Sequence, residues 1–315
     1  MGKTAYPKEF AEKLGVIMKE GRLLHAEPMA KHTTFRVGGP ADWFAYIESV
    51  EMLREVISLC KQYEVPYYVI GNGSNVLVSD AGMRGVVLRL SGEFEEITLS
   101  ESVPEGICRI TAGAGAMLAR LSMAAGKKGF TGLEFAGGIP GTVGGAVLMN
   151  AGAYGGEIKD TIWAADVLCA DGTIKRMECE ELSLSYRHSR LMETGGIVLR
   201  AYFTLKIRPK IEIFAAMESY KKARQEKQPL ELPSAGSTFK RPTGYFAGKL
   251  IQDAGLKGAS VGGAAVSTKH AGFVVNTGTA TAEDVYRLIL HVIKTVEEKY
   301  QVTLEPEVRI LGEFN

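Results

Sequence analysis

Residues 132–156 read GLEFAGGIPGTVGGAVLMNAGAYGG and hold nine glycines in 25 positions. Glycine loses more conformational freedom on folding than any other residue, so a cluster this dense needs a structural reason. A flexible linker would be polar and serine-rich, whereas this run contains apolar residues such as Phe135 and Val147, and Glu134 is its only ionised side chain. The pattern favours packed backbone lying against a bound anionic ligand, with amide N–H groups directed at it.

The composition of the whole chain is that of a globular protein. Its 315 residues are 46% hydrophobic and 23% charged, with a formal net charge of +1, and this length predicts two or three domains. The small net charge argues against a nucleic-acid partner. No apolar run approaches the roughly 18 residues of a membrane span, and the N-terminal segment lacks the apolar core of a signal peptide. We therefore expect a cytoplasmic protein without nucleic-acid or membrane partners.

The cysteines and histidines show no metal-binding spacing. Cys60, Cys108, Cys169 and Cys179 form no C-x-x-C pair, so we expect scattered thiols in a reducing compartment rather than disulfides. The five histidines likewise show no H-x-x-x-H or related spacing. The sequence therefore predicts no metal site.

Hydrophobic periodicity predicts a mixed α+β protein. Helices are expected at 7–20, 50–63, 211–228 and 281–300. Strands are expected at 67–70, 76–78, 86–90, 96–99, 107–111, 164–169, 173–177, 197–207, 261–266, 272–276 and 302–311. Thr281 and Asp284 have the spacing of a capping box, Asp171-Gly172 is a hairpin signal, and Arg208-Pro209-Lys210 is predicted to be a linker.

A second glycine motif, GNGSN at 71–75, follows the predicted strand 67–70. It does not match the dinucleotide fingerprint G-x-G-x-x-G, and the chain contains no P-loop motif G-x-x-x-x-G-K-[ST]. Taken alone, GNGSN is equally consistent with an ordinary tight turn. Two glycine-rich loops about 60 residues apart, each beside apolar strands, instead favour one large ligand, and FAD is long enough to contact both.

Several ordered segments together resemble the UDP-N-acetylenolpyruvoylglucosamine reductase (MurB) family. They are GNGSNVLVSD (71–80), the glycine run, TTFRVGGPAD (33–42), SYRHSR (185–190), AGSTFKRP (235–242), AGKLIQDAGLKG (247–258), KHAGFVVN (269–276) and LEPEVRILG (304–312). The resemblance implies an α+β fold with a two-lobed, PCMH-type (vanillyl-alcohol-oxidase-like) FAD-binding domain and a C-terminal α+β substrate domain. Its lobes would be 1–91, with the strand at 302–315 returning near the active site, and 92–208. The substrate domain would be 209–301.

The resemblance also implies an activity and its cofactors. It predicts NADPH-dependent, FAD-mediated reduction of UDP-N-acetylglucosamine enolpyruvate to UDP-N-acetylmuramate in peptidoglycan precursor synthesis. FAD is expected to be non-covalent, because neither flavin motif contains His or Cys. The implied FAD contacts are Arg36, Gly71, Asn72, Gly73, Ser74, Asn75, Gly137, Gly138, Ile139, Gly144 and Gly145.

Three residues are candidates for the chemistry. Ser237 would donate a proton to C2 of the enolpyruvyl group, although a Gly-Ser pair is more often an ordinary turn. Glu307 lies on the polar face of the predicted strand 302–311, where a solvated face is the plain alternative. Arg187 suits a carboxylate because its guanidinium is planar and always charged, although most arginines are simply at the surface. The resemblance decides for function at all three positions.

The UDP-sugar would contact the C-terminal domain. The implied contacts are Tyr186, Arg224, Lys227, Lys240 and Arg309; for Arg224-x-x-Lys227 a solvated helix face explains the pattern equally well. Arg241 stands where some family members have Asn. The interval from Arg190 to Ile197 is too short for the tyrosine-bearing loop of one family branch, which indicates the short-loop branch. We expect a monomer.

Two other functions were weighed. An alcohol or sugar oxidase of the same fold would bind FAD but would not require Ser237, Glu307 and Arg187 together. A catalytically inactive nucleotide-sugar sensor would not require these three polar groups either. The oxidase predicts NADPH consumption that does not depend on the enolpyruvyl substrate, with peroxide produced.

Overall fold

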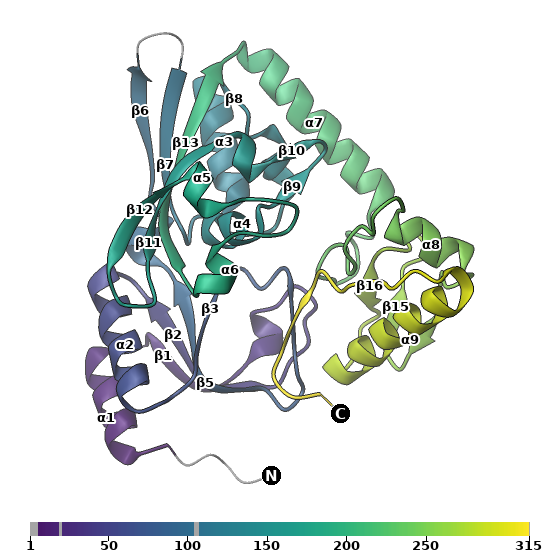
Figure 1. The fold of residues 1–315 in the computed structure, drawn as a ribbon, viewed down its shortest axis with the longest axis horizontal. Coiled ribbons are helices and arrows are strands. Elements are labelled where there is room, and N and C mark those ends of the chain that lie inside the picture. The colour runs from purple at the N-terminus through teal and green to yellow at the C-terminus, as the bar shows by residue number, and fades with distance from the viewer. Residues whose placement is uncertain (1–5, 19–20, 104–106, 315) are drawn as a thin grey trace. The chain divides into compact units, whose positions relative to one another are not determined.

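The computed structural model describes residues 6–18, 21–103 and 107–314 of the chain. By their internal contacts they form two compact units (Figure 1). Unit 1 comprises 1–23, 45–71 and 88–224, and unit 2 comprises 24–44, 72–87 and 225–315. Each unit is therefore assembled from three separate stretches of sequence.

Unit 1 is built on a six-stranded sheet of order β12-β11-β13-β7-β6, with β8 also paired to β13. Every pairing in it is antiparallel. The strands are β6 (Ile97–Val103), β7 (Ile107–Gly113), β8 (Phe130–Thr131), β11 (Ile162–Leu168), β12 (Ile174–Glu178) and β13 (Ile197–Ile207). The predicted β11–β12 hairpin is confirmed, because Asp171 caps the turn through Thr173 and Gly172 has a φ of +84°.

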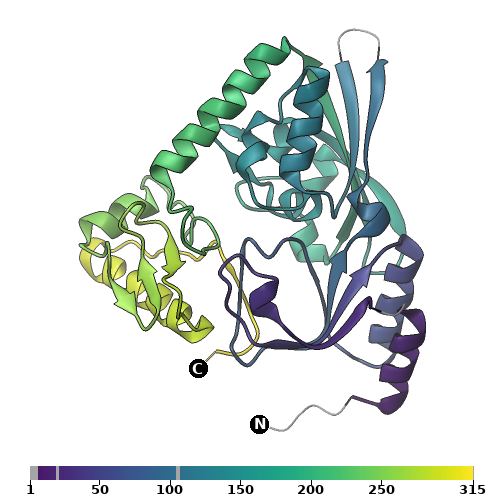
Figure 2. The same cartoon turned by 180° about the vertical axis from the view of Figure 1, so that it is seen from behind.

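Unit 1 also contains α-helices and 3₁₀ turns. Their bounds are α1 (Lys8–Ile17), α2 (Val50–Gln62), α3 (Leu118–Lys128), α4 (Val143–Met149), α5 (Cys179–Leu182), α6 (Leu191–Thr194) and α7 (Lys210–Lys227), with 3₁₀ turns at η2 (Gly92–Glu95), η3 (Glu134–Gly138) and η4 (Ile158–Asp160). Helix α4 packs on β13 and β7 (Figures 1 and 2). The short strands β9 (Gly152–Ala153) and β10 (Gly156–Glu157) form a separate hairpin.

A four-stranded sheet has the order β1-β2-β5-β3. Its strands are β1 (Leu23–Pro28), β2 (Pro40–Ile47), β3 (Tyr67–Ile70) and β5 (Met83–Leu90). The division into units falls within β1, β2 and β5, so each of these strands contributes residues to both units.

Unit 2 combines a three-stranded antiparallel sheet with two helices and a parallel strand pair. The sheet is β14 (Ser260–Val261), β15 (Ala264–Val266) and β16 (Val274–Asn276), and the helices are α8 (Ala247–Asp253) and α9 (Ala282–Tyr300). The pair is β4 (Val76–Val78) with β17 (Arg309–Leu311), and η1 (Met29–Lys31) is a 3₁₀ turn. Helix α9 packs against β15, β16 and α8.

One hydrophobic core joins the three stretches of unit 2. It buries Phe35 and Val37 from the TTFRVGGPAD segment and Leu77 from β4 together with Leu288 and Val292 of α9. All five side chains are at most 3% exposed. Burial of such side chains stabilises a fold by roughly 1.5–3 kcal/mol each. The two N-terminal segments that carry family motifs are therefore held by the same core as the C-terminal residues.

Helix α9 follows the sequence prediction closely. Thr281 and Asp284 form the expected capping box, and the apolar stripe from Val285 to Val296 is fully buried. The carboxylate of Asp80, from the GNGSNVLVSD segment, also accepts hydrogen bonds from the N–H groups of Ala282 and Glu283, both at 2.9 Å. The sequence pattern did not indicate this additional cap.

Several predicted elements are wrong in part. The strand expected at 261–266 is a hairpin of β14 and β15, because the chain turns at Gly262 and Gly263. The helix expected at 7–20 ends at Ile17, and residues 19–20 lie outside the described residues. The strand expected at 302–311 is limited to β17. The expected alternation of burial still holds there, since Leu304 and Val308 are buried while Glu305 and Arg309 are exposed. Pro306 interrupts the strand because it has no N–H to donate.

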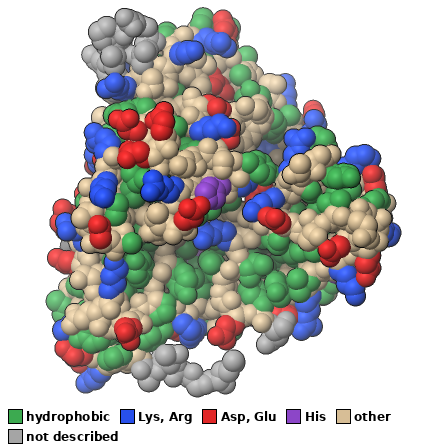
Figure 3. Space-filling view, in the orientation of Figure 1, with side chains coloured by type: hydrophobic (Ala, Val, Ile, Leu, Met, Phe, Trp, Pro, Cys, Tyr) green, Lys and Arg blue, Asp and Glu red, His purple; other side chains and the backbone are tan. Residues whose placement is uncertain are grey.

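None of the helices among the described residues combines the length and apolarity that crossing a bilayer requires. On the face drawn in Figure 3, basic and acidic side chains are interspersed rather than segregated. This distribution agrees with a net charge of +1.

We expect the cap of α9 to make stability depend on pH. Hydrogen bonds from the N–H groups of Thr281 (3.0 Å) and Gly263 (3.2 Å) hold the pKa of Asp284 below its ordinary 3.8. Because the pKa is depressed by folding, this stabilisation is present at neutral pH and is lost as the pH falls below about 4. Asp284→Ala should cost about 1 kcal/mol of unfolding free energy at pH 7. Calorimetry at pH 7 and pH 3 should show the difference from wild type shrinking at the lower pH.

A matched control is Asp253→Ala, which removes an exposed carboxylate paired with Lys249 one turn away on α8. Such pairs contribute little, so its effect at pH 7 should stay below about 0.5 kcal/mol. An equal effect of the two variants would mean that the capping bonds of Asp284 have no special weight.

Candidate functional site

The glycine run lies on unit 1 as a strip of exposed backbone between buried side chains. Gly137, Gly138 and Gly145 are exposed, whereas the neighbouring Phe135 and Val143 are buried. The backbone of this run is fixed by hydrogen bonds, among them Gly144 N–H to the carbonyl of Ala114 at 2.8 Å. The absence of side chains at these three positions leaves a rigid, peptide-lined surface that a ligand can approach closely.

The first glycine of the turn 71–75 lies against the glycine run. A Cβ on Gly71 would overlap the hydroxyl of Thr142, which is itself buried. Only glycine permits this approach, so the two glycine motifs meet within unit 1. The sequence prediction that they lie together is supported for Gly71; the rest of the turn, from Asn72 onward, belongs to unit 2.

Arg224 brings a positive charge to the same strip. A Cβ on Gly138 would lie 2.9 Å from Arg224 Nη1. Arg224 is half-buried, and burial lowers the pKa of its guanidinium below the ordinary 12.5. No carboxylate of the described residues pairs with it. A buried cation is costly unless paired, so an anionic ligand at Gly138 would supply the partner that the chain lacks here.

Two tyrosines stack beside this cation. The rings of Tyr154, in the glycine run, and Tyr220, on α7, lie 4.7 Å apart between centroids with only 5° between their planes. The contact ties the end of the glycine run to α7, the helix that also carries Arg224. Tyr154 has a φ of +54° and is 41% exposed.

Arg187 is presented by a tight hairpin turn. Ser185 and His188 exchange two backbone hydrogen bonds, both 3.1 Å, so that Tyr186 and Arg187 are the two central residues. Arg187 has a φ of +55°, a conformation that costs a non-glycine residue about 1–3 kcal/mol and is often found at functional sites. Its guanidinium lies 5.0 Å from the centre of the Tyr186 ring and donates to the carbonyl of Gly152 at 3.4 Å.

A buried asparagine anchors that hairpin. Asn150 is fully buried and donates through Nδ2 to the carbonyl of Ser185 at 3.0 Å and to the Glu157 carboxylate at 2.7 Å. Its Oδ1 accepts from Lys159 N–H at 2.9 Å. No local sequence pattern singles out Asn150, because its partner Ser185 lies 35 residues away.

In unit 2 the turn 72–75 packs on the TTFRVGGPAD segment. The carbonyl of Gly73 accepts from Thr34 N–H at 3.1 Å, and a Cβ on Gly73 would overlap the carbonyl oxygen of His32. Arg36 is exposed with a φ of +56°, fixed by its N–H to Thr33 (3.1 Å) and by the Thr33 hydroxyl to Val37 (2.9 Å). The structure thus brings Arg36 and the turn into one region of unit 2.

Ser237 and Glu307 are brought together on adjacent segments of unit 2. Thr238, which follows Ser237, accepts at its carbonyl from Glu307 N–H at 2.8 Å. One step on, Phe239 and Pro306 form an antiparallel bridge. Ser237 is exposed at the end of this contact, and Gly236 before it has a φ of +76°. The hydroxyl of Ser237 and the carboxyl of Glu307, which are 70 residues apart in sequence, therefore lie on neighbouring segments of unit 2.

Thr238 fixes this arrangement and was not among the predicted site residues. It is fully buried, donates its N–H to Gly272 at 2.8 Å and accepts from Val274 N–H at its hydroxyl at 3.0 Å. Gly272 N–H in turn donates to Nδ1 of His270 at 3.1 Å, and burial lowers the pKa of His270. In the sequence, the only signal for a role of Thr238 is its position directly after Ser237.

The remaining predicted substrate contacts are at the surface. Lys240 forms an ion pair with Glu305 at 3.0 Å. Lys227 is the exposed last residue of α7, in unit 2, whereas Arg224 is in unit 1. Arg309 is exposed on β17 and makes no ion pair with any described residue, Glu307 included. Arg187 and Tyr186 belong to unit 1 and Ser237 and Glu307 to unit 2, so the meeting of all three catalytic candidates stays a prediction.

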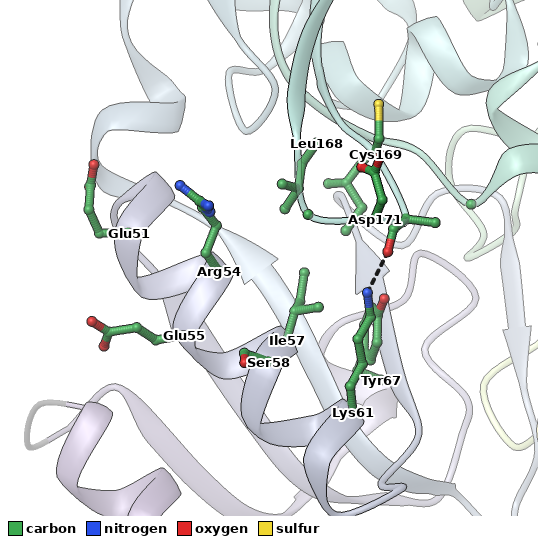
Figure 4. Close-up of a pocket in the computed structure, with 14 residues that line it drawn as sticks. Glu51, Arg54, Glu55, Ile57, Ser58, Lys61, Tyr67, Leu168, Cys169 and Asp171 are labelled. Carbon is green, nitrogen blue, oxygen red and sulfur yellow. Dashed lines mark hydrogen bonds between the residues drawn. The ribbon is translucent and has the colours of Figure 1, made fainter.

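A separate pocket of about 540 Å³ lies between α2 and the β11–β12 hairpin (Figure 4). Lys61 spans its edge by donating to the carbonyl of Ala170 at 2.6 Å. Arg54, Glu55 and Asp171 give it mixed charge. None of its lining residues is a predicted site residue, and we assign it no role.

The cysteines and potential metal ligands add no chemistry to these regions. All four cysteines are free, and burial raises the pKa of Cys60 to about 12, which makes it an inert core thiol. Among the described residues, no three His, Cys, Asp or Glu side chains cluster as metal ligands do.

Comparison with known proteins places these features in context. Residues 41–178 match the family model of an FAD binding domain, and residues 228–311 match that of the UDP-N-acetylenolpyruvoylglucosamine reductase C-terminal domain. The chain is 55% identical to the UDP-N-acetylenolpyruvoylglucosamine reductase of Agathobacter rectalis over 93% of its length and 95% of that protein. It is 52% identical to the one from Lachnoclostridium phytofermentans, over 96% and 97% of the two chains.

A solved structure agrees with these matches. The crystal structure of the UDP-N-acetylenolpyruvylglucosamine reductase (MurB) from Thermus caldophilus has a TM-score of 0.76 and 39% identity. The alignment covers 92% of this chain and 98% of that one. The likeness therefore extends over both units rather than over one shared domain.

We expect Gly73→Ala to reduce the amount of FAD that co-purifies with the protein. The new Cβ would overlap the His32 carbonyl, so the turn would have to move away from the TTFRVGGPAD segment. Gly155→Ala is the matched control, because Gly155 also has a positive φ (+85°) but has no neighbouring atom within 4 Å of the new Cβ. The ratio of flavin to protein absorbance measures the result, and equal losses in both variants would attribute the effect to backbone strain alone.

Proposed function

Because the chain belongs to the UDP-N-acetylenolpyruvoylglucosamine reductase family, we propose the roles of its residues in that family's reaction. The enzyme is a flavin-dependent oxidoreductase, UDP-N-acetylmuramate dehydrogenase, with FAD as cofactor and NADPH as reductant. It reduces the enolpyruvyl group of UDP-N-acetylglucosamine enolpyruvate to give UDP-N-acetylmuramate for peptidoglycan synthesis. The individual residue roles below are proposals.

The residues present suit FAD. The exposed backbone at Gly137, Gly138 and Gly145 offers a side-chain-free surface, and the turn 71–75 offers close-packed backbone. Peptide N–H groups in such loops favour phosphate oxygens. We propose that Arg36, Gly71, Asn72, Gly73, Ser74, Asn75, Gly137, Gly138, Ile139, Gly144 and Gly145 contact the cofactor. Binding is non-covalent in this proposal.

The chemistry that the chain must support is a hydride transfer followed by a protonation. Bound FAD supplies hydride from its N5 to C3 of the enol ether, after reduction by NADPH. Negative charge then develops at C2 and spreads into the neighbouring carboxylate. The protein must stabilise this charge and deliver a proton to C2.

We assign the proton to Ser237. Its hydroxyl is exposed on a short loop whose geometry depends on the positive φ of Gly236. The next residue, the buried Thr238, makes hydrogen bonds through its N–H, its carbonyl and its hydroxyl group. The loop is therefore held in place where the Ser237 hydroxyl is presented. A hydroxyl is a weak acid, and Glu307 on the adjacent segment is the group assigned to act with it near C2.

We assign the substrate carboxylate to Arg187. A guanidinium stays charged and can donate two parallel hydrogen bonds to a carboxylate. Arg187 has a strained backbone conformation at the tip of the hairpin turn, and Asn150 holds this turn by donating to the carbonyl of Ser185. Stabilising charge at the carboxylate lowers the energy of the enolate-like state more than that of the ground state.

The substrate is proposed to contact Tyr186, Arg224, Lys227, Lys240 and Arg309, with Arg224 and Lys227 at the diphosphate. The strongest support is for Arg224, a half-buried cation without a carboxylate partner among the described residues. Lys240 would have to exchange its ion pair with Glu305 for a substrate phosphate. That exchange is inexpensive, because exposed pairs contribute only about 0–1 kcal/mol.

We further propose the predicted lobes, 1–91 with 302–315, 92–208 and 209–301, as functional divisions. The two compact units partition the chain by internal contacts and do not test these lobes. A monomer in the cytoplasm, without nucleic-acid or membrane partners, completes the proposal. The net charge of +1 supports the absence of a nucleic-acid partner.

The contact between the Ser237 and Glu307 segments carries this assignment, and a kinetic experiment tests it. Purified protein should be yellow and should release FAD on denaturation. It should oxidise NADPH over many turnovers only when UDP-N-acetylglucosamine enolpyruvate is present. NADPH consumption at the same rate without that substrate, with peroxide formed, would indicate an oxidase and contradict the assignment.

Ser237→Ala should separate the two half-reactions. Loss of a general acid costs about 10²–10⁴-fold in the step it serves, so reoxidation of reduced flavin by the enolpyruvyl substrate should slow by that factor. Reduction of the flavin by NADPH should be unchanged, because it does not involve C2. Stopped-flow absorbance of the flavin follows both steps. Unaltered reoxidation by substrate would remove Ser237 from the role of acid.

A further inference from the structure

We propose that Asn75 is a positioning residue for Glu307 and not solely a contact of the cofactor. Its side chain holds the peptide that carries Glu307, and so couples the flavin turn 71–75 to the catalytic carboxyl. This inference rests on the proposed function, since it concerns how the group assigned there is placed.

The observation is a pair of hydrogen bonds from one residue to one segment. Asn75 Nδ2 donates to the carbonyl of Glu307 at 3.0 Å, and the Asn75 carbonyl accepts from Arg309 N–H at 3.0 Å. These bonds continue the parallel β4–β17 pairing, whose register begins at Val76 opposite Arg309. Both residues lie in unit 2 although 232 positions separate them.

The other side of the same peptide segment is held by Thr238. Glu307 N–H donates to the Thr238 carbonyl at 2.8 Å, while the Glu307 carbonyl accepts from Asn75 Nδ2. Residue 307 is therefore fixed between the segment that follows Ser237 and the turn assigned to the flavin. With both peptide groups held, the direction of its Cα–Cβ bond is determined.

Pro306 explains why a side chain is used for this contact. Proline offers no N–H, so the strand cannot continue regularly through residue 306, and β17 begins only at Arg309. The chain at 71–74 meanwhile turns away from the pairing direction of β4. A side-chain carboxamide bridges the gap between a turn and an irregular segment, where no backbone donor of a regular strand is available.

The consequence for catalysis is geometric. Displacing a reacting group by about 1 Å can cost about a hundredfold in rate. Without the bond from Asn75, the Glu307 carbonyl would lose the side-chain donor that helps to fix the orientation of its peptide. The carboxyl would then be held less precisely near C2, whereas reduction of bound FAD by NADPH, which does not involve C2, would be affected less.

The test is a double-mutant cycle on the two half-reactions of the holoenzyme. On the fraction of protein that holds FAD, Asn75→Ala should slow reoxidation of reduced flavin by the enolpyruvyl substrate by about 10- to 100-fold more than it slows reduction by NADPH. In a Glu307→Gln background, the same substitution should slow reoxidation by less than about twofold, because it acts through the carboxyl already removed.

Asn75→Asp provides a second variant of nearly the same shape. At pH 8 its carboxylate has no proton to donate and faces the Glu307 carbonyl, so reoxidation should be at least as slow as in Asn75→Ala. The matched control is Asp80→Ala, which removes two side-chain bonds from the same part of the chain to the start of α9. It should lower thermal stability but leave the ratio of the two half-reaction rates unchanged.

Several results would overturn the proposal. Equal slowing of both half-reactions, or loss of FAD from both Asn75 variants, would leave Asn75 as a cofactor contact only. Full additivity with Glu307→Gln, or wild-type reoxidation in Asn75→Asp, would show that it does not act through Glu307. Failure of both variants to fold while Asp80→Ala folds would make Asn75 a stability residue. If wild-type reduced flavin is not reoxidised by the substrate, the proposed function itself fails, which is a separate outcome.

Discussion

The antiparallel contact between residues 238–240 and 305–307 is the interaction on which the candidate chemistry depends. It consists of two backbone hydrogen bonds, Glu307 to Thr238 and Lys240 to Glu305, both 2.8 Å. Beyond it, β17 pairs with β4, so three segments remote in sequence lie side by side in unit 2. A hydroxyl, a carboxyl and a flavin turn thereby come from adjacent chains. Their spacing is set by peptide geometry, which is far less variable than the packing of long side chains.

In unit 1, as in unit 2, an asparagine side chain holds the backbone of an irregular segment. There Arg187, to which we assign the substrate carboxylate, is at the tip of a hairpin. Asn150 donates to the carbonyl of Ser185 at 3.0 Å, the same distance as from Asn75 to the Glu307 carbonyl. A primary amide has two donors and one acceptor group, so it can satisfy several backbone groups at once. In both places it supports irregular backbone, where strand hydrogen bonds are not available. Strained residues such as Arg187 persist because their surroundings are held in this manner.

The sequence predicted local structure well and long-range structure only through the family resemblance. Helix α9, with its cap at Thr281, and the hairpin at Asp171-Gly172 were correct because capping and turn chemistry act over three or four residues. The strand at 302–311 was too long, because alternating burial persisted across Pro306 although regular pairing could not. Ser237 and Glu307 were chosen from motifs, yet no local pattern could reveal that Thr238 or Asn75 joins their segments.

Helix α7 shows how packing decides which unit a segment belongs to. The change of composition and periodicity at 208–210 indicates a linker between β13 and α7, and α7, which begins at Lys210, stays with unit 1 as far as Arg224. Glycine in α3 makes this possible: a Cβ on Gly126 would lie 3.1 Å from Met217 and 3.3 Å from Ile213, both on α7. Close packing of α7 on α3 therefore keeps α7 in unit 1 as far as Arg224. That packing also places Arg224 beside Gly138, so a glycine inside a helix, remote from any ligand motif, helps to determine where this cation is located.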